Sequence, residues 1–228
     1  MSYLSENLCE IEQRITFSCE TAGRKRDDVL LIAVSKTKPI SLLEEAYACG
    51  IRDFGENRVQ ELTQKAESMP DDIRWHMIGH LQKNKVKAAV RHAYMIHSVD
   101  SLVLAETISA EAVKQSKSIN ILLEVNIAGE ESKFGYSPSE VLTDISAIAA
   151  LPNLKIKGLM TIAPFTEIAE SNRDYFRQLK ELAVDITNKN IDNVDMEVLS
   201  MGMSGDFQVA IEEGATMIRV GTSVFGER

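Results

Sequence analysis

Eight short apolar segments, rich in strand-forming residues, alternate with helical patterns along the whole chain. The strand candidates are residues 29–36, 52–56, 74–79, 94–99, 120–127, 156–163, 196–201 and 217–222. The helical patterns between them cover 41–49, 57–68, 82–91, 101–115, 138–150, 167–188 and 206–213. Strands that are separated by helices run parallel, because each helix carries the chain back across the sheet. Eight such units favour a closed (β/α)8 barrel, the TIM-barrel fold, over an open sheet.

Two further features refine this prediction. Leu4, Leu8, Ile11 and Ile15 recur with helical spacing and predict an extra helix at the N-terminus. Because no Ser/Pro-rich linker or change of composition interrupts the alternation, we expect residues 1–228 to form a single domain. An open doubly wound sheet is the alternative, but its Gly-x-Gly-x-x-Gly signal does not follow the first strand, and no Walker pattern occurs.

Composition restricts the class of protein. The net charge of −9 argues against general binding of nucleic acid. The basic residues Lys83, Lys85, Lys87 and Arg91 are more typical of a solvated helix face. No apolar run is long enough to span a bilayer, and the N-terminus lacks a signal peptide's basic flank and apolar block. Three cysteines without Cys-x-x-Cys spacing indicate a reduced, cytoplasmic protein.

Lys36 ends the first predicted strand. Alternation along that strand places Lys36 on the same face as Leu30, Ile32 and Val34. An amine that projects from an apolar face is poorly solvated, which lowers its pKa from the usual value of about 10.4. A neutral amine attacks aldehydes, so this position suits the formation of a Schiff base. Taken alone, Lys36 is better described as a solvated lysine at the end of a strand, and the other segments of the chain reverse that preference.

The loops after the seventh and eighth strands contain groups that suit a phosphate. These are the loops that commonly hold phosphate in (β/α)8 barrels. The first contains Gly202, Ser204 and Gly205 ahead of a helix, and the second contains Gly221 and Thr222. Glycines allow a close approach of the backbone, and N–H groups at a helix start attract anions. A helix cap at Ser204 and a tight bend at Gly221 are the structural alternatives.

Arg219 lies two residues before Gly221 on the predicted inner face of the last strand. A guanidinium inside a barrel must be paired or hydrogen-bonded, because an isolated buried charge is very costly. One interpretation is an ion pair with Glu56 or Glu124. The other is donation to a ligand's acceptor nitrogen. A ligand with an aldehyde, a ring nitrogen and a phosphate would meet Lys36, Arg219 and the two loops, and pyridoxal 5′-phosphate (PLP) has this combination.

Several ordered segments carry a family resemblance over nearly the whole chain. They are 32–39 (IAVSKTKP), 54–61 (FGENRVQE), 75–85 (WHMIGHLQKNK), 96–100 (IHSVD), 157–160 (KGLM), 199–204 (LSMGMS) and 218–222 (IRVGT). With these segments the chain resembles the pyridoxal phosphate homeostasis proteins, single-domain relatives of the alanine racemase barrel with the fold-type III arrangement of PLP-binding proteins.

The resemblance implies roles for individual residues. Lys36 would carry PLP covalently as an internal aldimine, and Ser204, Gly221 and Thr222 would contact the phosphate. Asn57 would lie near the ring, and Arg219 would face the pyridine nitrogen. Ser200 and Met201 would be close neighbours of the cofactor. Lys38, on the same strand parity as Lys36, could receive the cofactor during transfer, but its position favours a solvated lysine at the end of the strand.

We expect a carrier or buffer of PLP with no catalytic residues. An arginine beside the pyridine nitrogen keeps that nitrogen unprotonated and the ring a weak electron sink. The resemblance implies that racemases take a base from a second domain, and the sequence ends at Arg228, directly after the eighth strand. Expected partners are PLP and PLP-dependent apoenzymes, with no nucleic acid or membrane, and we expect a monomer.

Two alternatives remain open at this stage. A weak amino-acid racemase would use Tyr47, His80 or water as its acid or base. A metal-dependent hydrolase would use His76, His80 and His97, because histidines at strand ends are common zinc ligands. No acidic ligand accompanies these histidines, so hydrogen-bonding histidines and no metal are expected. Residues 130–135 form a predicted solvated loop that could cover the barrel mouth.

Overall fold

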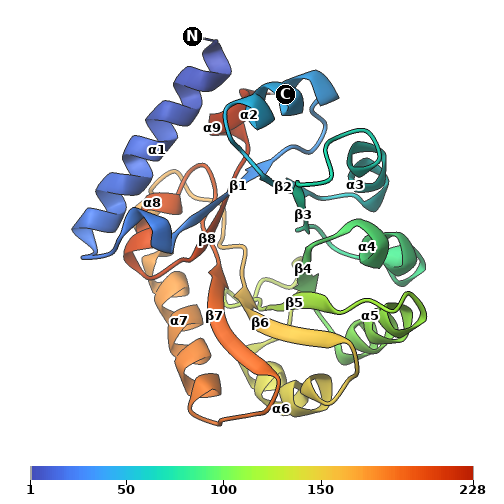
Figure 1. The fold of residues 1–228 in the computed structure, drawn as a ribbon. Helices are drawn as coiled ribbons and strands as arrows, with labels where there is room; N and C mark the ends of the chain where they lie inside the picture. The colour runs from blue at the N-terminus through green and yellow to red at the C-terminus, as the bar shows by residue number, and fades with distance from the viewer. Residues whose placement is uncertain (1, 228) are drawn as a thin grey trace.

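The computed structural model describes residues 2–227 and contains a closed barrel in the order β1 to β8. Figure 1 shows the ring of strands with the helices arranged around it. Every pair of neighbouring strands is parallel, including β8 with β1. The strands are Leu30–Val34 (β1), Asp53–Glu56 (β2), Arg74–Met77 (β3), Met95–Val99 (β4), Ile119–Glu124 (β5), Leu154–Met160 (β6), Val194–Ser200 (β7) and Met217–Val220 (β8). All eight predicted strands are confirmed, and most end earlier than predicted.

The helices follow the predicted patterns with two differences. They are Tyr3–Thr21 (α1), Ile40–Ala48 (α2), Val59–Ala66 (α3), Val86–His92 (α4), Leu102–Lys114 (α5), Pro138–Ala149 (α6), Arg173–Thr187 (α7), Phe207–Glu212 (α8) and Thr222–Phe225 (α9). Short 3-10 helices occupy Arg26–Asp28 (η1), Lys83–Lys85 (η2) and Ala169–Asn172 (η3). The predicted helices 82–91 and 167–188 each begin as a 3-10 segment, and α9 was not predicted.

The predicted N-terminal helix is present as α1. Its start is capped by the Ser2 hydroxyl, which accepts a hydrogen bond from the Ser5 N–H. Leu4, Leu8, Ile11 and Ile15 are all buried, on the face that packs against α8 and α9. Burial of each such side chain contributes about 1.5–3 kcal/mol. The helix therefore covers the side of the barrel where β8 meets β1 (Figure 1).

Side chains of the strands divide between two apolar clusters. One cluster fills the inside of the barrel and is built by Ile32, Met95, Leu122, Met160 and Met217, which come from five different strands. The other lies between the strands and the surrounding helices and includes Leu31, Ala33, Ile218 and Val220. The predicted alternation along β1 and β8 is therefore confirmed.

One glycine allows a close approach between two strands. Gly158 in β6 has φ +153°, and a Cβ atom there would lie 1.8 Å from the backbone oxygen of Val198 in β7. The pairing register shifts on both sides of β6 near this residue. Only glycine fits here, so Gly158 permits the local irregularity in the barrel wall.

Two general features of the described residues bear on the expected class. Cys9, Cys19 and Cys49 are all free thiols. No helix within residues 2–227 has both the length and the hydropathy that a membrane span requires.

Candidate functional site

A cavity of about 460 Å³ opens where the carboxyl ends of the strands meet. Its walls come from the loops after β1, β2, β3, β6, β7 and β8. Six of the predicted site residues line it: Lys36, Asn57, Ser204, Arg219, Gly221 and Thr222. In a (β/α)8 barrel this end is where ligands bind.

Lys36 lies at one side of this cavity, two residues beyond the end of β1. Its side chain is half-buried, and Val34 beside it on the same face also lines the cavity. The chain then turns sharply, because Thr37 adopts a φ of +63°. Such a backbone angle is strained for a β-branched residue. The Glu61 carboxylate accepts a hydrogen bond from the Thr37 N–H at 2.6 Å, which holds the turn in place.

A buried ion pair lies directly beneath the Lys36 segment. Lys65 Nζ donates to the backbone oxygen of Ser35 and to Glu56 Oε1, each at 2.7 Å. The Ser35 hydroxyl donates to the same carboxylate oxygen at 2.6 Å. Burial raises the pKa of Glu56 above its usual range, against the opposing effects of Lys65 and Ser35. The role of Lys65 could not be deduced from the sequence, because Ser35 and Glu56 lie on other elements.

The loops after β7 and β8 form one wall of the cavity. Ser204 Oγ lies 3.3 Å from the Gly221 nitrogen and 3.5 Å from the Ser223 nitrogen, so the two donor-rich loops meet at this hydroxyl. Gly221 is the N-cap of α9 and provides no side-chain cap. The N–H groups of Gly221 and Ser223 instead donate to the Ser204 hydroxyl oxygen, and Ser204, Gly221 and Thr222 all line the cavity.

Asp206 fixes the shape of this wall. One carboxylate oxygen accepts from the Met203 N–H at 2.7 Å, and the other accepts from the Asn172 side-chain amide at 2.8 Å. Gly202 makes the turn possible with φ +90°, where a Cβ atom would lie 2.6 Å from Ala210 Cβ. The position of Asn172 could not be deduced from the sequence, because it ends the 3-10 helix η3 and meets Asp206 only in the folded chain.

Arg219 lies at the base of the cavity and is only 4% exposed. It donates to Ser200 Oγ at 2.6 Å and to the backbone oxygen of Thr161 at 2.8 Å. Burial lowers its pKa to about 10, although Glu124 and Asp206 favour the charged form. Two of its five N–H groups are used in these bonds, which leaves donors for a ligand.

The first of the two interpretations of Arg219, an ion pair with Glu56 or Glu124, is not found in the structure. No carboxylate in residues 2–227 lies within ion-pairing distance of Arg219, and Glu56 pairs with Lys65 instead. The guanidinium is held by a hydroxyl and a carbonyl oxygen. Because both partners are neutral, they do not cancel the positive charge of the guanidinium, which can act on a ligand in the cavity.

Ser200 and Met201 lie beneath the cavity and do not line it. Ser200 is fully buried and contacts Arg219 and His97. Met201 is fully buried in the apolar layer between the strands and the helices. Ser200 therefore affects the cavity only through its hydrogen bond with Arg219.

The three histidines considered as zinc ligands do not meet at one place in the structure, because His80 lies apart from the other two. His76 Nδ1 lies 2.9 Å from His97 Nε2 in the barrel interior. His80 follows β3 in a loop, where it pairs with Asp100 and stacks on Phe134. Across the described part of the chain, no group of three or more His, Cys, Asp or Glu side chains is arranged to hold a metal ion.

Two observations differ from what the sequence predicted: the surroundings of Lys38, and which loop forms part of the cavity wall. Lys38 lines the cavity, but its ammonium donates to the backbone oxygens of Phe225, Gly226 and Glu227 at 3.3, 3.0 and 2.8 Å. It is therefore not a fully solvated lysine. The loop after β6 contributes Ile162 and residues 164–166 to the cavity wall, whereas residues 130–135 do not line it.

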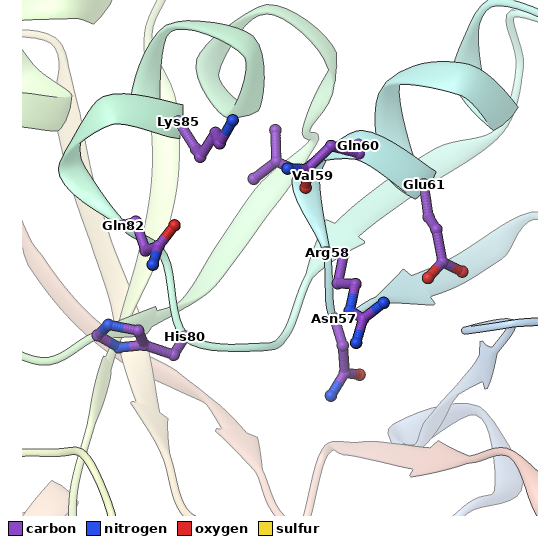
Figure 2. Close-up of a pocket in the computed structure, with 8 residues that line it drawn as sticks. All are labelled: Asn57, Arg58, Val59, Gln60, Glu61, His80, Gln82 and Lys85. Carbon is purple, nitrogen blue, oxygen red and sulfur yellow. The ribbon is translucent and has the colours of Figure 1, made fainter.

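A second, more polar hollow of about 500 Å³ adjoins the first and shares Asn57 with it. In Figure 2, Gln82 and Lys85 extend from one wall, and Asn57 and Arg58 extend from the other. The segments 54–61 and 75–85, separate in the sequence, thus meet beside the cavity. Asn57 is the residue that connects the two spaces.

The fold and the lysine-bearing cavity define a barrel of the alanine racemase N-terminal type. The family model described as "Alanine racemase, N-terminal domain" matches residues 7–228. A pyridoxal phosphate homeostasis protein from Aquifex aeolicus is 46% identical over 224 residues, which cover 98% of this chain and 97% of the relative. The chain belongs to the family of pyridoxal phosphate homeostasis proteins.

Solved structures agree with this assignment. PipY from Synechococcus elongatus, in a structure without PLP, is 38% identical with a TM-score of 0.88 and covers 98% of this chain and 100% of PipY. A structure of PipY with PLP bound has a TM-score of 0.85 and 37% identity, with the same coverage. The predicted fold and the resemblance of the sequence to this family are confirmed.

Proposed function

We propose that this protein binds PLP covalently through Lys36 and acts as a carrier or buffer of the cofactor. The observation that carries the proposal is the placement of a half-buried Lys36 in one cavity with Arg219 and the wall formed by Ser204 and Gly221. Each group suits a different part of PLP: the amine suits the aldehyde, the guanidinium the ring nitrogen, and the donor-rich wall the phosphate. The PLP-bound structure of PipY supports the choice of ligand.

Each side chain has a distinct part in this proposal. Bound PLP supplies a pyridine ring and an aldehyde, and the aldehyde condenses reversibly with a primary amine. The hydroxyls of Ser204 and Thr222 and the N–H of Gly221 would hold the phosphate. Arg219 would donate to the ring nitrogen, and Asn57 would lie beside the ring. Ser200 supports this arrangement through its contact with Arg219, whereas Met201 packs between the strands and the helices.

The ionisable groups of the cavity support a carrier better than an enzyme. Besides Lys36 and Arg219, the ionisable side chains that line it are Lys38 and Asp206. Lys38 is held by three backbone oxygens, and Asp206 by Met203 and Asn172. An arginine cannot take up a proton from a substrate, and it keeps the ring nitrogen unprotonated.

Neither side chain considered for a racemase lines the cavity. Tyr47 is near the C-terminal end of α2 and donates to Asp72 at 2.8 Å, at the opposite end of the barrel. His80 lines the neighbouring hollow and contacts Asp100 and Phe134. Both placements favour the carrier.

Transfer to an apoenzyme tests the proposal directly. The PLP-loaded protein is freed of excess cofactor and mixed with an apo-transaminase, whose activity is then followed. The control is free PLP at the concentration that the loaded protein releases. We expect the loaded wild-type protein to activate the transaminase more than this control does. Lys36→Ala prepared in the same way should give no activation. Equal activation by the variant contradicts the proposal.

Hydrogen exchange separates the carrier from the racemase. D- and L-amino acids are incubated with the loaded protein in deuterated buffer, and α-proton exchange is followed by NMR. A carrier gives exchange no faster than free PLP. Exchange at enzyme-like rates, lost in Lys36→Ala, would assign catalysis to the protein.

The partners and compartment belong to the same proposal. PLP-dependent apoenzymes are the proposed recipients, and the proposed state is a monomer of a single domain, which sedimentation of the loaded protein checks. Three free cysteines support a reducing compartment such as the cytoplasm.

A further inference from the structure

A continuous line of buried, hydrogen-bonded side chains runs through the barrel from Arg219 to Asp53. Arg219 contacts Ser200 Oγ at 2.6 Å, and Ser200 Oγ lies 2.9 Å from His97 Nδ1. His97 Nε2 lies 2.9 Å from His76 Nδ1, and His76 Nε2 lies 3.0 Å from Asp53 Oδ1. All five residues are buried, and they come from five different strand positions around the barrel.

The far end of this line is anchored by an ion pair at the start of β2. Asp53 begins β2, and its carboxylate accepts from Arg74 Nε at 2.7 Å. Burial would raise the pKa of Asp53, but hydrogen bonds from His76 and Arg74 hold it below its usual range. Asp53 is therefore an ionised carboxylate that can only accept hydrogen bonds.

The two ends fix the direction of every bond between them. Arginine only donates, so Ser200 Oγ accepts from Arg219 and its own hydroxyl proton must go to its other partner, His97 Nδ1. His97 is then protonated at Nε2 and donates to His76 Nδ1. His76 is in turn protonated at Nε2 and donates to Asp53. Every proton in the line points from Arg219 towards Asp53.

The opposite set of proton positions does not satisfy the groups at either end of the line. If His97 carried its proton on Nδ1, Ser200 would have donors on both sides and its hydroxyl proton would have no partner among the described residues. His76 would also turn an unprotonated nitrogen towards the Asp53 carboxylate. Burial lowers the pKa of His97 and of His76, so neither ring gains a second proton near neutral pH. A single arrangement satisfies all groups.

We infer that His97 and His76 are positioning residues that act through Ser200 to hold Arg219, so that its remaining N–H donors face the cavity. A buried arginine is normally fixed by a carboxylate, which would neutralise its charge beside the ligand. Here the line of neutral groups orients the guanidinium, and the two carboxylates that favour its charged form, Glu124 and Asp206, make no ion pair with it. Arg219 thus stays a fixed, charged donor. The choice of PLP's ring nitrogen as its acceptor rests on the proposed function.

The tautomers can be measured on the intact protein without cofactor. Long-range ¹H–¹⁵N correlation spectra of the ¹⁵N-labelled protein near pH 7 should show His76 and His97 as neutral rings with the proton on Nε2. His76→Gln and His97→Gln assign the signals. A proton on Nδ1 of either ring, or a doubly protonated ring, would overturn the inference, and this result does not depend on whether PLP binds.

A pair of substitutions at His97 tests the effect on Arg219. His97→Gln keeps the direction of the line, because its oxygen can accept from Ser200 while its amide donates to His76. His97→Leu has a similar size but breaks the line. We expect the dissociation constant for PLP to rise about tenfold in His97→Leu, as for a lost hydrogen bond to a charged group, and by no more than about twofold in His97→Gln.

The absorption spectrum gives a second readout. The absorption maximum of bound PLP should move in His97→Leu and stay in place in His97→Gln, because only the former releases Arg219 from its position. His92→Leu, at a half-buried histidine outside the line, is the matched control. A folded His97→Leu variant with wild-type affinity for PLP and a wild-type spectrum would refute the inference. Equal losses of affinity in His97→Leu and His97→Gln would also refute it.

Failure of the wild-type protein to bind PLP would instead refute the proposed function. The tautomer measurement would still test the line of hydrogen bonds in that case.

Discussion

Lys65 Nζ lies 2.7 Å from the backbone oxygen of Ser35, the residue that immediately precedes Lys36. The contact ties α3 to the end of β1. Because the same ammonium pairs with the buried Glu56, the position of the Lys36 segment depends on an ion pair that never reaches the cavity. Support from a second layer of residues is what keeps a reactive group in one orientation.

Removal of the Lys65 charge should therefore affect both stability and cofactor loading. Lys65→Met leaves Glu56 buried without its cation, and loss of one partner of a buried pair costs about 3–5 kcal/mol. Chemical denaturation measures this loss. Lys65→Met combined with Glu56→Gln should recover part of it, and Lys189→Met, at an exposed lysine, should be neutral. An unchanged stability in Lys65→Met would contradict the supporting role.

Stability should also depend on the ionisation of Glu124. Burial, with a further contribution from Asp100 and against Arg219, raises the pKa of Glu124 from 4.5 to about 7. Its Oε2 atom is buried without a hydrogen-bond partner. The folded state holds this proton more tightly than the unfolded chain, so stability falls as the pH rises from about 4.5 to 7, by about 3 kcal/mol from this residue.

Glu124→Gln isolates this effect, because the amide stays neutral at every pH. The variant and the wild type should be similarly stable near pH 4.5, and the variant should be the more stable at pH 8 by up to about 3 kcal/mol. Urea denaturation at both pH values measures the difference, with the exposed Glu131→Gln as control. Parallel stability profiles for wild type and Glu124→Gln would show that folding does not shift the pKa of this carboxyl, which would contradict the prediction.

Gly79 should control the position of Asn57. A Cβ atom at Gly79 would lie 2.5 Å from the backbone oxygen of Asn57 and 2.7 Å from its Cα, so the backbone must move. We expect Gly79→Ala to cost about 1–3 kcal/mol through overpacking and to weaken PLP binding by displacing Asn57 from the cavity wall. Denaturation and equilibrium titration with PLP measure the two effects.

Gly205 provides the matched control for this substitution. It lines the same cavity, but a Cβ atom there would have no heavy atom within 4 Å. Gly205→Ala should therefore keep the affinity for PLP. If Gly79→Ala bound PLP as tightly as Gly205→Ala, Asn57 would not be needed at its present position.

Local sequence patterns were sufficient to predict the barrel and the direction of its key side chains. The alternation of apolar residues placed Ile32 and Arg219 on inner faces, and the structure confirms both, because a strand has a fixed period of two residues. The short helix α9 was missed, since four residues, Thr222–Phe225, are too few to show a helical period. The sequence also could not show that η2 and η3 begin two of the helices.

The supporting contacts of the site depended on distances that the sequence does not contain. His97 and Ser200 are separated by 103 positions and meet only because β4 and β7 both face the barrel interior. The pairing of Glu56 with Lys65 rather than Arg219 likewise depends on how α3 packs behind β2. Individual groups could be predicted from their strand positions, whereas their partners required the closed barrel.

Borohydride reduction of the PLP-loaded protein, followed by peptide mapping, tests the central claim most directly. The reduced linkage is stable to digestion, so the mass of each peptide reports which amine held the cofactor. We expect the phosphopyridoxyl group on Lys36 in stoichiometric amount, and its loss in Lys36→Ala. A label on Lys38 or Lys65 in the wild-type protein, or no label at all, would contradict the account.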